Sequence, residues 1–198
     1  MIRVAQVGCA VLLAAAAFAQ AESAASRPAP LFDGRTLGGW HALGDALYTV
    51  EPGELNRAEI VGKVGGGAQS FLVSDRAFAD FELELELRNE APGNSGVQLR
   101  SHVNDKGRLY GYQIEIDPSV RAWSGGLYDE ARRGWLDDLS DDEAARKAFK
   151  PGAWNRYRIV CDGPWIRAWV NGVPTADRLD PLDLEGHFAL QVHSGKDT

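Results

Sequence analysis

Cysteine is almost absent from this sequence: its 198 residues contain two, Cys9 and Cys161. Cys9 falls in a segment that we expect to be removed, so Cys161 would have no partner for an internal disulfide, and a zinc site built from cysteines is excluded. The simplest interpretation of Cys161 is a small buried apolar residue. An exported protein without a disulfide framework is typical of a bacterial periplasm or outer surface.

Clusters of positive charge are also absent. The formal net charge is -7, and the charged residues are spread along the chain. Because nucleic acids and anionic membrane surfaces attract clustered Lys and Arg, this charge argues against both as partners. A neutral sugar fits the charge balance, as do many other ligands.

Long apolar runs are confined to the N-terminus. Arg3 precedes an Ala-rich apolar stretch at residues 4–19, and two A-x-A patterns end at Ala19 and Ala21. We expect a secretory signal peptide at residues 1–21, too short for a membrane span, followed by a linker at 22–30. The mature protein is then periplasmic or secreted, with no stable membrane insertion, and its domain occupies residues 31–198.

Short segments of alternating apolar and polar residues make up most of this domain. In residues 80–88 apolar side chains alternate with charged ones, which predicts a strand with one buried and one solvated face. Many short strands with turn residues between them predict an all-β sandwich or jelly roll. Further strands are expected at residues 95–101, 110–117, 155–161, 165–170 and 187–193.

One short helix and one long loop are expected between these strands. The sequence from Ser140 to Glu143 matches a capping box, residues 144–149 favour a helix, and Pro151 would end it. Residues 120–139 show no clean period and predict a surface loop of a length that is usually functional.

The alternation also predicts which polar side chains share a face of the sheet. If Tyr112, Ile114 and Ile116 fill the core, their polar neighbours point to the opposite face. That face would collect side chains from three strands: Gln98, Arg100, Gln113, Glu115, Asp117, Gln191 and His193.

Neighbouring carboxylates on this face suggest acid and base chemistry. Glu115 and Asp117 can split in pKa, so that one acts as a base while the other stays charged; a salt bridge to Arg100 is the alternative. His193 can serve as base, acid or metal ligand, or simply end its strand. Together, Glu115, Asp117 and His193 could hold a divalent metal ion, and no organic cofactor is indicated.

Other candidates lie on loops. Asn94 and Ser95 follow a glycine and can bind sugar hydroxyls or merely form a turn. Trp123 and Trp135 can stack on a sugar or anchor their loop. The expected long loop also supplies Tyr128, Asp129, Arg133 and Trp135 as substrate-binding candidates.

Seven motifs in register resemble those of one family. They are LFDGRTLGGW at residues 31–40, GNSGVQLR at 93–100, YQIEID at 112–117, GGLY at 125–128, WN at 154–155, WVNG at 169–172 and LQVH at 190–193. The sequence is thereby similar to the 3-keto-disaccharide hydrolase domain family, described as 3-keto-glucoside 1,2-lyases and 3-keto-2-hydroxy-glucal hydratases.

The resemblance implies a concanavalin A-like jelly roll of two antiparallel sheets, with a sugar site on the concave sheet. It implies periplasmic action on glucosides oxidised at C3. Family members continue with a further strand after the LQVH motif, whereas this sequence stops at Thr198. We therefore expect the final strand to be missing, which would leave an unpaired edge.

A ketone at C3 acidifies the hydrogen on C2, so a base can remove it while the C1 substituent leaves. Water added to the product gives 3-keto-glucose. This chemistry needs a base, a proton donor and positive charge at the enolate oxygen, for which Glu115, Asp117, His193 and Arg100 are the candidates.

Three alternatives remain at this stage. A conventional glycosidase is suggested by Glu115-Ile116-Asp117, but the second glutamate that it would need is absent. A non-catalytic carbohydrate-binding module can use the same fold and aromatic wall. A structural surface domain is the third possibility.

Overall fold

The computed structural model describes residues 29–53, 57–89 and 93–194. The expected signal peptide and all but two residues of the linker lie outside the described residues, as do the four C-terminal residues where a strand was expected to be missing. Residues from Phe32 onward form one unit. In the described ranges, no helix is long and apolar enough to cross a membrane.

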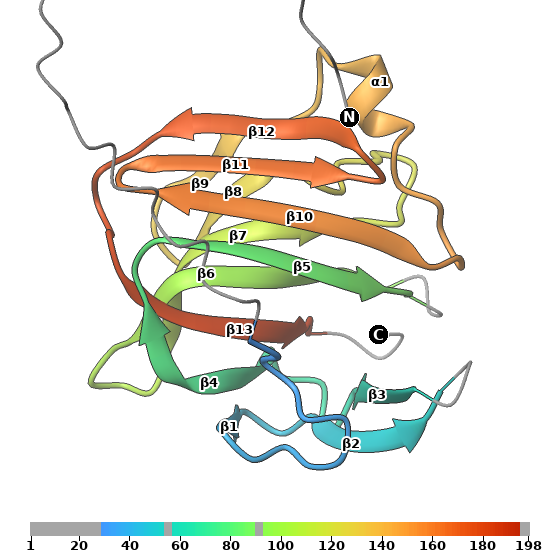
Figure 1. Cartoon of the computed structure of the whole chain (residues 1–198), viewed down its shortest axis with the longest axis vertical. Helices are drawn as coiled ribbons and strands as arrows, with labels where there is room; N and C mark the ends of the chain where they lie inside the picture. The colour runs from blue at the N-terminus through green and yellow to red at the C-terminus, as the bar shows by residue number, and fades with distance from the viewer. Residues whose placement is uncertain (1–28, 54–56, 90–92, 195–198) are drawn as a thin grey trace, which may run out of the picture. The chain divides into compact units, whose positions relative to one another are not determined.

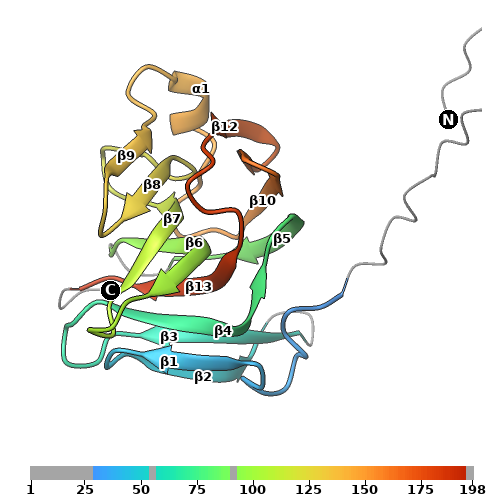
Figure 2. The same cartoon turned by 90° about the vertical axis from the view of Figure 1, so that its left-hand side faces the viewer.

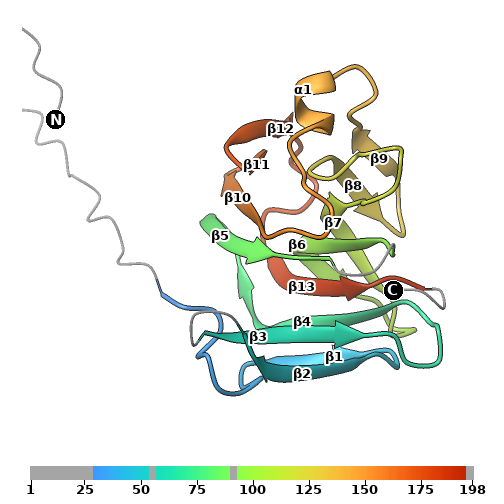
Figure 3. The same cartoon turned by 90° about the vertical axis from the view of Figure 1, so that its right-hand side faces the viewer.

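Two antiparallel sheets form the predicted sandwich (Figure 1). Figures 2 and 3 show the layers from the side, with β10 and β12 on one side and β7 and β8 on the other. The seven-stranded sheet contains, in spatial order, β1 (Trp40–Leu43), β4 (Ser70–Phe78), β13 (Gly186–Val192), β6 (Ser95–Val103), β7 (Leu109–Ile116), β8 (Leu127–Glu130) and β9 (Gly134–Asp137). The four-stranded sheet contains β12 (Val173–Leu179), β11 (Trp165–Val170), β10 (Asn155–Asp162) and β5 (Phe81–Leu87), and β2 (Leu47–Pro52) pairs with β3 (Ala58–Lys63) in a separate hairpin.

Alternation along the strands fills the space between the sheets. Tyr112 and Ile114 of β7 are completely buried, as are Tyr157 and Ile159 of β10. The hydroxyl of Tyr157 donates to the backbone carbonyl of Glu115 at 3.3 Å, which ties the two sheets together. Cys161 is buried and free, as expected.

The charged face of β5 is exposed to solvent, as its alternation predicts. Glu82 pairs with Arg158 at 2.6 Å, and Glu84 pairs with Arg156 at 2.7 Å. Exposed ion pairs of this kind contribute about 0–1 kcal/mol each to the free energy of unfolding, so they add little to the stability of the sheet.

The predicted capping box was wrong. The helix α1 (Glu143–Arg146) is a single turn that begins two residues later, because Asp142 is its N-cap and accepts a hydrogen bond from the Ala145 amide at 2.8 Å. Ser140 instead bonds to Asp138 through its amide at 2.9 Å.

The predicted long loop at residues 120–139 was also wrong. Residues 127–130 and 134–137 form β8 and β9, which extend the seven-stranded sheet beyond β7. Each strand has only four residues; Ala131 in the turn between them and Gly134, the first residue of β9, both have positive φ. Strands this short show too few alternations for a period to be visible in the sequence.

Candidate functional site

One row of side chains crosses the face of the seven-stranded sheet that is turned away from the four-stranded sheet, here called the outer face. Paired residues of antiparallel strands share a face, and alternation adds Glu115 and Gln191 to it. The structure therefore places Gln98, Gln113 and Glu115 together, as predicted. The register pairs that define the row join His41, Val73, Ala189, Gln98, Gln113, Tyr128 and Trp135.

A chain of buried amides leads to Glu115 on this face. Ser101 Oγ donates to Gln98 Oε1 at 2.9 Å, Gln98 Nε2 donates to Gln113 Oε1 at 2.5 Å, and Gln113 Nε2 donates to Glu115 Oε2 at 2.7 Å. Asn94 donates to the other carboxylate oxygen. A carboxylate only accepts, so its charge sets the direction of the whole chain.

Burial raises the pKa of Glu115, whose residue surface is only 3% exposed. The hydrogen bonds from Asn94 and Gln113 and the nearby charge of Arg121 offset part of that rise. A carboxylate in this state is a stronger base than an exposed one.

Asp117 behaves in the opposite way, so the two carboxylates are split as expected. Burial alone would raise its pKa, but hydrogen bonds from Ser119 and Arg121 outweigh burial and hold the pKa below its ordinary value. Arg121 Nε donates to Asp117 Oδ2 at 2.7 Å, and Asp117 also accepts from the Ser119 amide. Asp117 therefore stays ionised and orders the turn that follows β7.

Arg121 is the positive charge that the sequence analysis missed. Its Nη2 lies 3.7 Å from Glu115 Oε1, and its side chain is 42% exposed, so it reaches both the carboxylates and solvent. The signal in the sequence was weak, because Arg121 stands in a turn-rich segment without a period.

Aromatic rings surround this guanidinium. Arg121 lies 4.8 Å from the ring centroid of Trp123 and 5.1 Å from that of Trp135. Trp135 meets Trp123 edge-on at 4.9 Å and Tyr128 at 5.1 Å. All three rings are half-buried, which provides an aromatic wall beside Glu115.

Arg100 was wrongly placed on this face. Its φ of 44° and a register shift between Leu99 and His102 mark a bulge, which turns its side chain away from Gln98. The buried guanidinium instead donates to the carbonyl oxygens of Ala79 and Gly163 and pairs with Asp80 at 3.0 Å. It thus joins the turns at the edge of the sandwich.

Asp129 and Arg133 also belong to a different cluster from the one predicted. Asp129 pairs with Tyr112 in the sheet register, so its side chain points to the core side and not to the outer face. Arg133 binds Asp129 and also Asp180, at 2.8 Å, and lies over the Tyr112 ring. This network closes one end of the core.

The remaining predicted residues lie on β13 and at the start of β6. Ser95 Oγ donates to the Gln191 backbone carbonyl at 2.7 Å, so its hydroxyl has a structural bond. The Gln191 amide is 4% exposed, and neither of its polar atoms has a hydrogen-bond partner among the described residues. A buried amide without partners is costly unless a ligand or water binds it.

His193 follows β13. Continuing the register beyond the pair Leu190 and Val97 brings His193 opposite Asn94, the residue that bonds Glu115. Its Nδ1 contacts the Ser194 carbonyl at 2.8 Å. Within the described ranges no three His, Cys, Asp or Glu side chains group as a metal site requires, so Glu115, Asp117 and His193 do not assemble as the predicted ligand set.

The two packed antiparallel sheets define a jelly-roll domain. Solved structures with this fold include the carbohydrate-binding module CBM66 of Bacillus subtilis, a putative glycosyl hydrolase of Parabacteroides distasonis and a Bacillus subtilis protein of unknown function with a galectin-like fold. Their identities to this chain are 13%, 14% and 11%, with TM-scores of 0.55, 0.53 and 0.55. The aligned regions cover 79%, 83% and 78% of this chain and 88%, 87% and 83% of theirs, and at such identities they show the fold alone.

The chain belongs to the 3-keto-alpha-glucoside-1,2-lyase-like domain family, whose model matches residues 27–197. The resemblance inferred from its motifs is thus confirmed. A comparison with curated proteins gives no match.

Proposed function

We propose that this domain cleaves glucosides oxidised at C3 by removing the proton on C2 and eliminating the C1 substituent. The observation that carries the proposal is the buried Glu115, with its raised pKa, beside the half-exposed guanidinium of Arg121. The membership in the lyase-like family supports it.

In the elimination, the Glu115 carboxylate takes the C2 proton and negative charge develops on the C3 oxygen. Arg121 stabilises that charge, in the role that the sequence analysis had given to Arg100. The bond between C1 and the leaving oxygen then breaks, and His193 in its protonated form donates a proton to that oxygen. The product has a double bond between C1 and C2.

In the hydration that follows, water adds to C1 of this product. Neutral His193 takes a proton from the water, and protonated Glu115 returns its proton to C2. Both groups regain their starting states, and the net reaction is hydrolysis to 3-keto-glucose. The aromatic wall of Trp123 and Trp135 would contact the sugar ring.

A substrate carrying deuterium at C2 tests this chemistry directly. We expect slower turnover than with the hydrogen-bearing substrate and release of deuterium into water, because the bond between C2 and its hydrogen breaks. Glycoside cleavage at an unchanged rate with deuterium retained at C2 would contradict the proposal.

A divalent metal ion is the other electrophile to test. Because Arg121 supplies the positive charge here, we expect the rate to be unchanged after treatment with a chelator and removal of free metal. Loss of activity that a divalent ion restores would show that the carboxylates and His193 do bind one.

A non-catalytic sugar-binding module is the second candidate. The almost complete burial of Glu115, Gln98 and Gln113 favours it, since a substrate must reach the base. CBM66, which shares the fold, is itself named as a carbohydrate-binding module. Such a module would bind 3-keto-glucosides without turning them over, which the deuterium experiment would reveal.

A further inference from the structure

A strip of aromatic and charged side chains lies on the solvent face of the four-stranded sheet. Every second residue of β11 is completely buried in the core, so the residues between them, Trp165, Arg167 and Trp169, point to solvent. Asp177 of β12 lies opposite Arg167 in the register and completes the set, here called the β11 strip. Trp165 is 45% exposed, an open position for so large an apolar ring.

Both indole rings of the β11 strip are held in place by polar neighbours. Trp165 Nε1 donates to the Asp177 carboxylate, and the Arg167 guanidinium lies 5.8 Å from the centroid of the Trp165 ring. The guanidinium of Arg158 lies 4.6 Å from the Trp169 ring. A ring that is already ordered loses little conformational entropy when a ligand packs against it, which favours binding.

The guanidinium of Arg167 is free to bind a ligand. Arg156 and Arg158 of the neighbouring strand form ion pairs with glutamates of β5. Across the three described segments, no acidic side chain pairs with Arg167, and its Nε has no hydrogen-bond partner. Asp177 faces it but bonds to Trp165. The strip therefore offers the donors of one guanidinium and the remaining lone pairs of one carboxylate.

This combination suits an uncharged ligand that is rich in hydroxyl groups. Arg167 and Asp177 balance in charge, and sugar hydroxyls can both donate and accept, so a saccharide can bind both groups. The tryptophan rings supply apolar surface for the carbon face of a sugar ring. A polyanion is disfavoured by Asp177 and by the net charge of -7.

The spacing of the two rings indicates an extended ligand. Trp165 and Trp169 are four residues apart on one strand, about 13 Å at a rise of about 3.3 Å per residue. A single sugar ring cannot contact both, whereas several linked rings can. Polysaccharides with β-linkages form extended ribbons of this kind, and α-linked glucans coil.

We propose that the β11 strip binds an extended, uncharged, β-linked polysaccharide. The strip lies on the four-stranded sheet and Glu115 on the opposite side of the sandwich, so the bound polymer takes no part in the elimination. The strip would instead hold the protein on a glycan, and this role does not depend on the proposed function.

Electrophoresis in native gels that contain a polymer tests the ligand class. The three polymers are a soluble mixed-linkage β-glucan, a soluble glucomannan and polygalacturonate, which is anionic. We expect at least one of the two neutral polymers to retard the purified protein and polygalacturonate to have no effect. Migration unchanged by both neutral polymers, or equal retardation by polygalacturonate, would overturn the proposal.

Two variants test the residues of the strip. Trp165→Ala should weaken binding to the retarding polymer about tenfold, because an aromatic anchor is lost. Arg167→Lys keeps the charge but loses the planar fork of donors, so it should also weaken binding. Circular dichroism would verify that both variants fold. Wild-type affinity in both would exclude the strip as the binding site.

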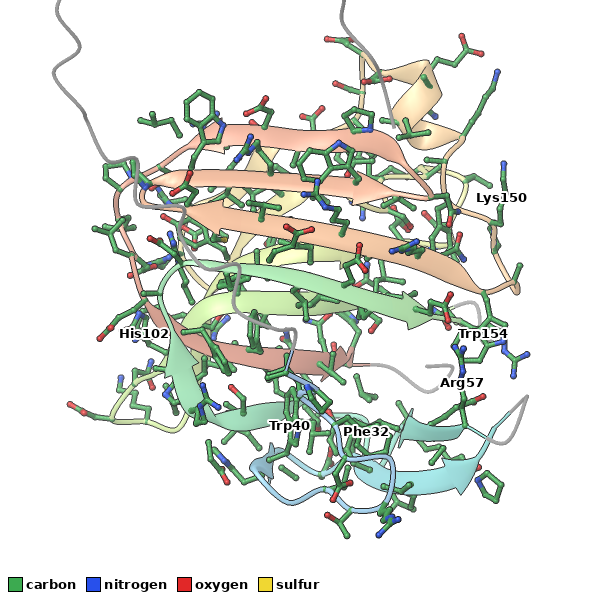
Figure 4. All side chains as sticks on the ribbon, in the orientation of Figure 1. Phe32, Trp40, Arg57, His102, Lys150 and Trp154 are labelled. Carbon is green, nitrogen blue, oxygen red and sulfur yellow. The ribbon has the colours of Figure 1, made fainter. Side chains whose placement is uncertain are left out.

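Trp154→Ala is the matched control. Trp154 is 37% exposed and has the Arg88 guanidinium 5.0 Å from its ring, so its surroundings resemble those of Trp165. It precedes β10 (Figure 4), about 26 Å along that strand from Asp162, the register partner of Trp165. Binding by this variant should equal that of the wild type. An equal loss in both tryptophan variants would mean non-specific adhesion and would overturn the proposal.

A second copy of this chain is the other occupant that such a face can take. Sedimentation velocity should give the same mass for the wild type and Trp165→Ala. A wild-type dimer that this variant dissociates would show an interface between copies and overturn the proposal. Turnover of a methyl 3-keto-glucoside should be unchanged in Trp165→Ala. If the wild type shows no turnover, the proposed function fails, while the gels still decide the strip.

Discussion

Replacing Glu115 by glutamine is expected to abolish turnover of a 3-keto-glucoside and leave the fold intact. Glutamine cannot accept the C2 proton, and loss of a positioned base costs about 10²- to 10⁴-fold in rate. The measurement is kcat with the purified Glu115→Gln variant, together with its circular dichroism spectrum and thermal midpoint.

The amide chain explains why this variant should fold. Gln113 and Gln98 can each turn their amide over, so that the chain of donors runs in the opposite direction. Ser101 Oγ then accepts from Gln98 and donates to the carbonyl oxygens of Leu99 or Tyr112, which lie 3.1 and 3.4 Å away. No buried polar atom of the chain loses its partner, so the large penalty of an unsatisfied group is avoided.

The pH dependence of stability gives a second readout. Because the pKa of Glu115 is raised in the folded state, the stability contributed by its protonated form is fully present below the ordinary value of about 4.3. It is lost as the pH rises through the raised pKa. The Glu115→Gln variant has no such group, so the free energy of unfolding of the wild type should fall relative to it over that window.

The matched control is Glu84→Gln, which removes an exposed carboxylate paired with Arg156 on the other sheet. It should change kcat by less than twofold, a bound that follows from the weak coupling of surface charges. Full activity in Glu115→Gln would exclude Glu115 as the base. Equal losses in both variants would point to general damage instead.

Alternation predicted the fold because it reports burial directly. The face of β5 carries glutamates that meet arginines of β10 in solvent, and the opposite face packs inside, so the pattern was clear. The same logic failed at β8, where Asp129 and Glu130 are buried among apolar neighbours. Ion pairs with Arg132 and Arg133 compensate the buried charge of Asp129, and no local sequence pattern indicates them.

The site was predicted in part for the same reason. The alternation of side chains along a strand correctly predicted the face of Gln98, Gln113 and Glu115, because all three lie where the pairing of β6 with β7 is regular. It failed two residues after Gln98, where the bulge at Arg100 reverses the side chain. Alternation could not predict the position of the Arg121 side chain, because that position depends on how the turn after β7 folds back toward Glu115.

Replacing Gly96 by alanine is expected to damage the site more than its small size suggests. Gly96 pairs with Glu115 across β6 and β7, and the Gln113 side chain lies over it. A Cβ at this position would come within 2.3 Å of Gln113 Cδ and 2.5 Å of its Cγ. The methyl group must therefore push Gln113 away from Gln98 and Glu115.

Two measurements follow from this clash. Overpacking a buried site costs about 1–3 kcal/mol of unfolding free energy, which urea denaturation would measure. Because Gln113 holds the base Glu115, displacing Gln113 should lower kcat about 10²-fold, as a misplacement of a catalytic group by about 1 Å can do. Gly96 is not at positive φ in this fold, so backbone strain does not contribute to the effect.

The Gln113→Ala background supplies the control, because the added methyl group at position 96 then meets no glutamine side chain. In that background Gly96→Ala should cost less than half of the free energy that it costs in the wild type, and kcat should not fall further. Such non-additivity is the signature of two residues in direct contact. Equal costs in the two backgrounds would show that Gly96 matters for some reason other than the room it leaves for Gln113, and the amide chain would lose its role in holding Glu115.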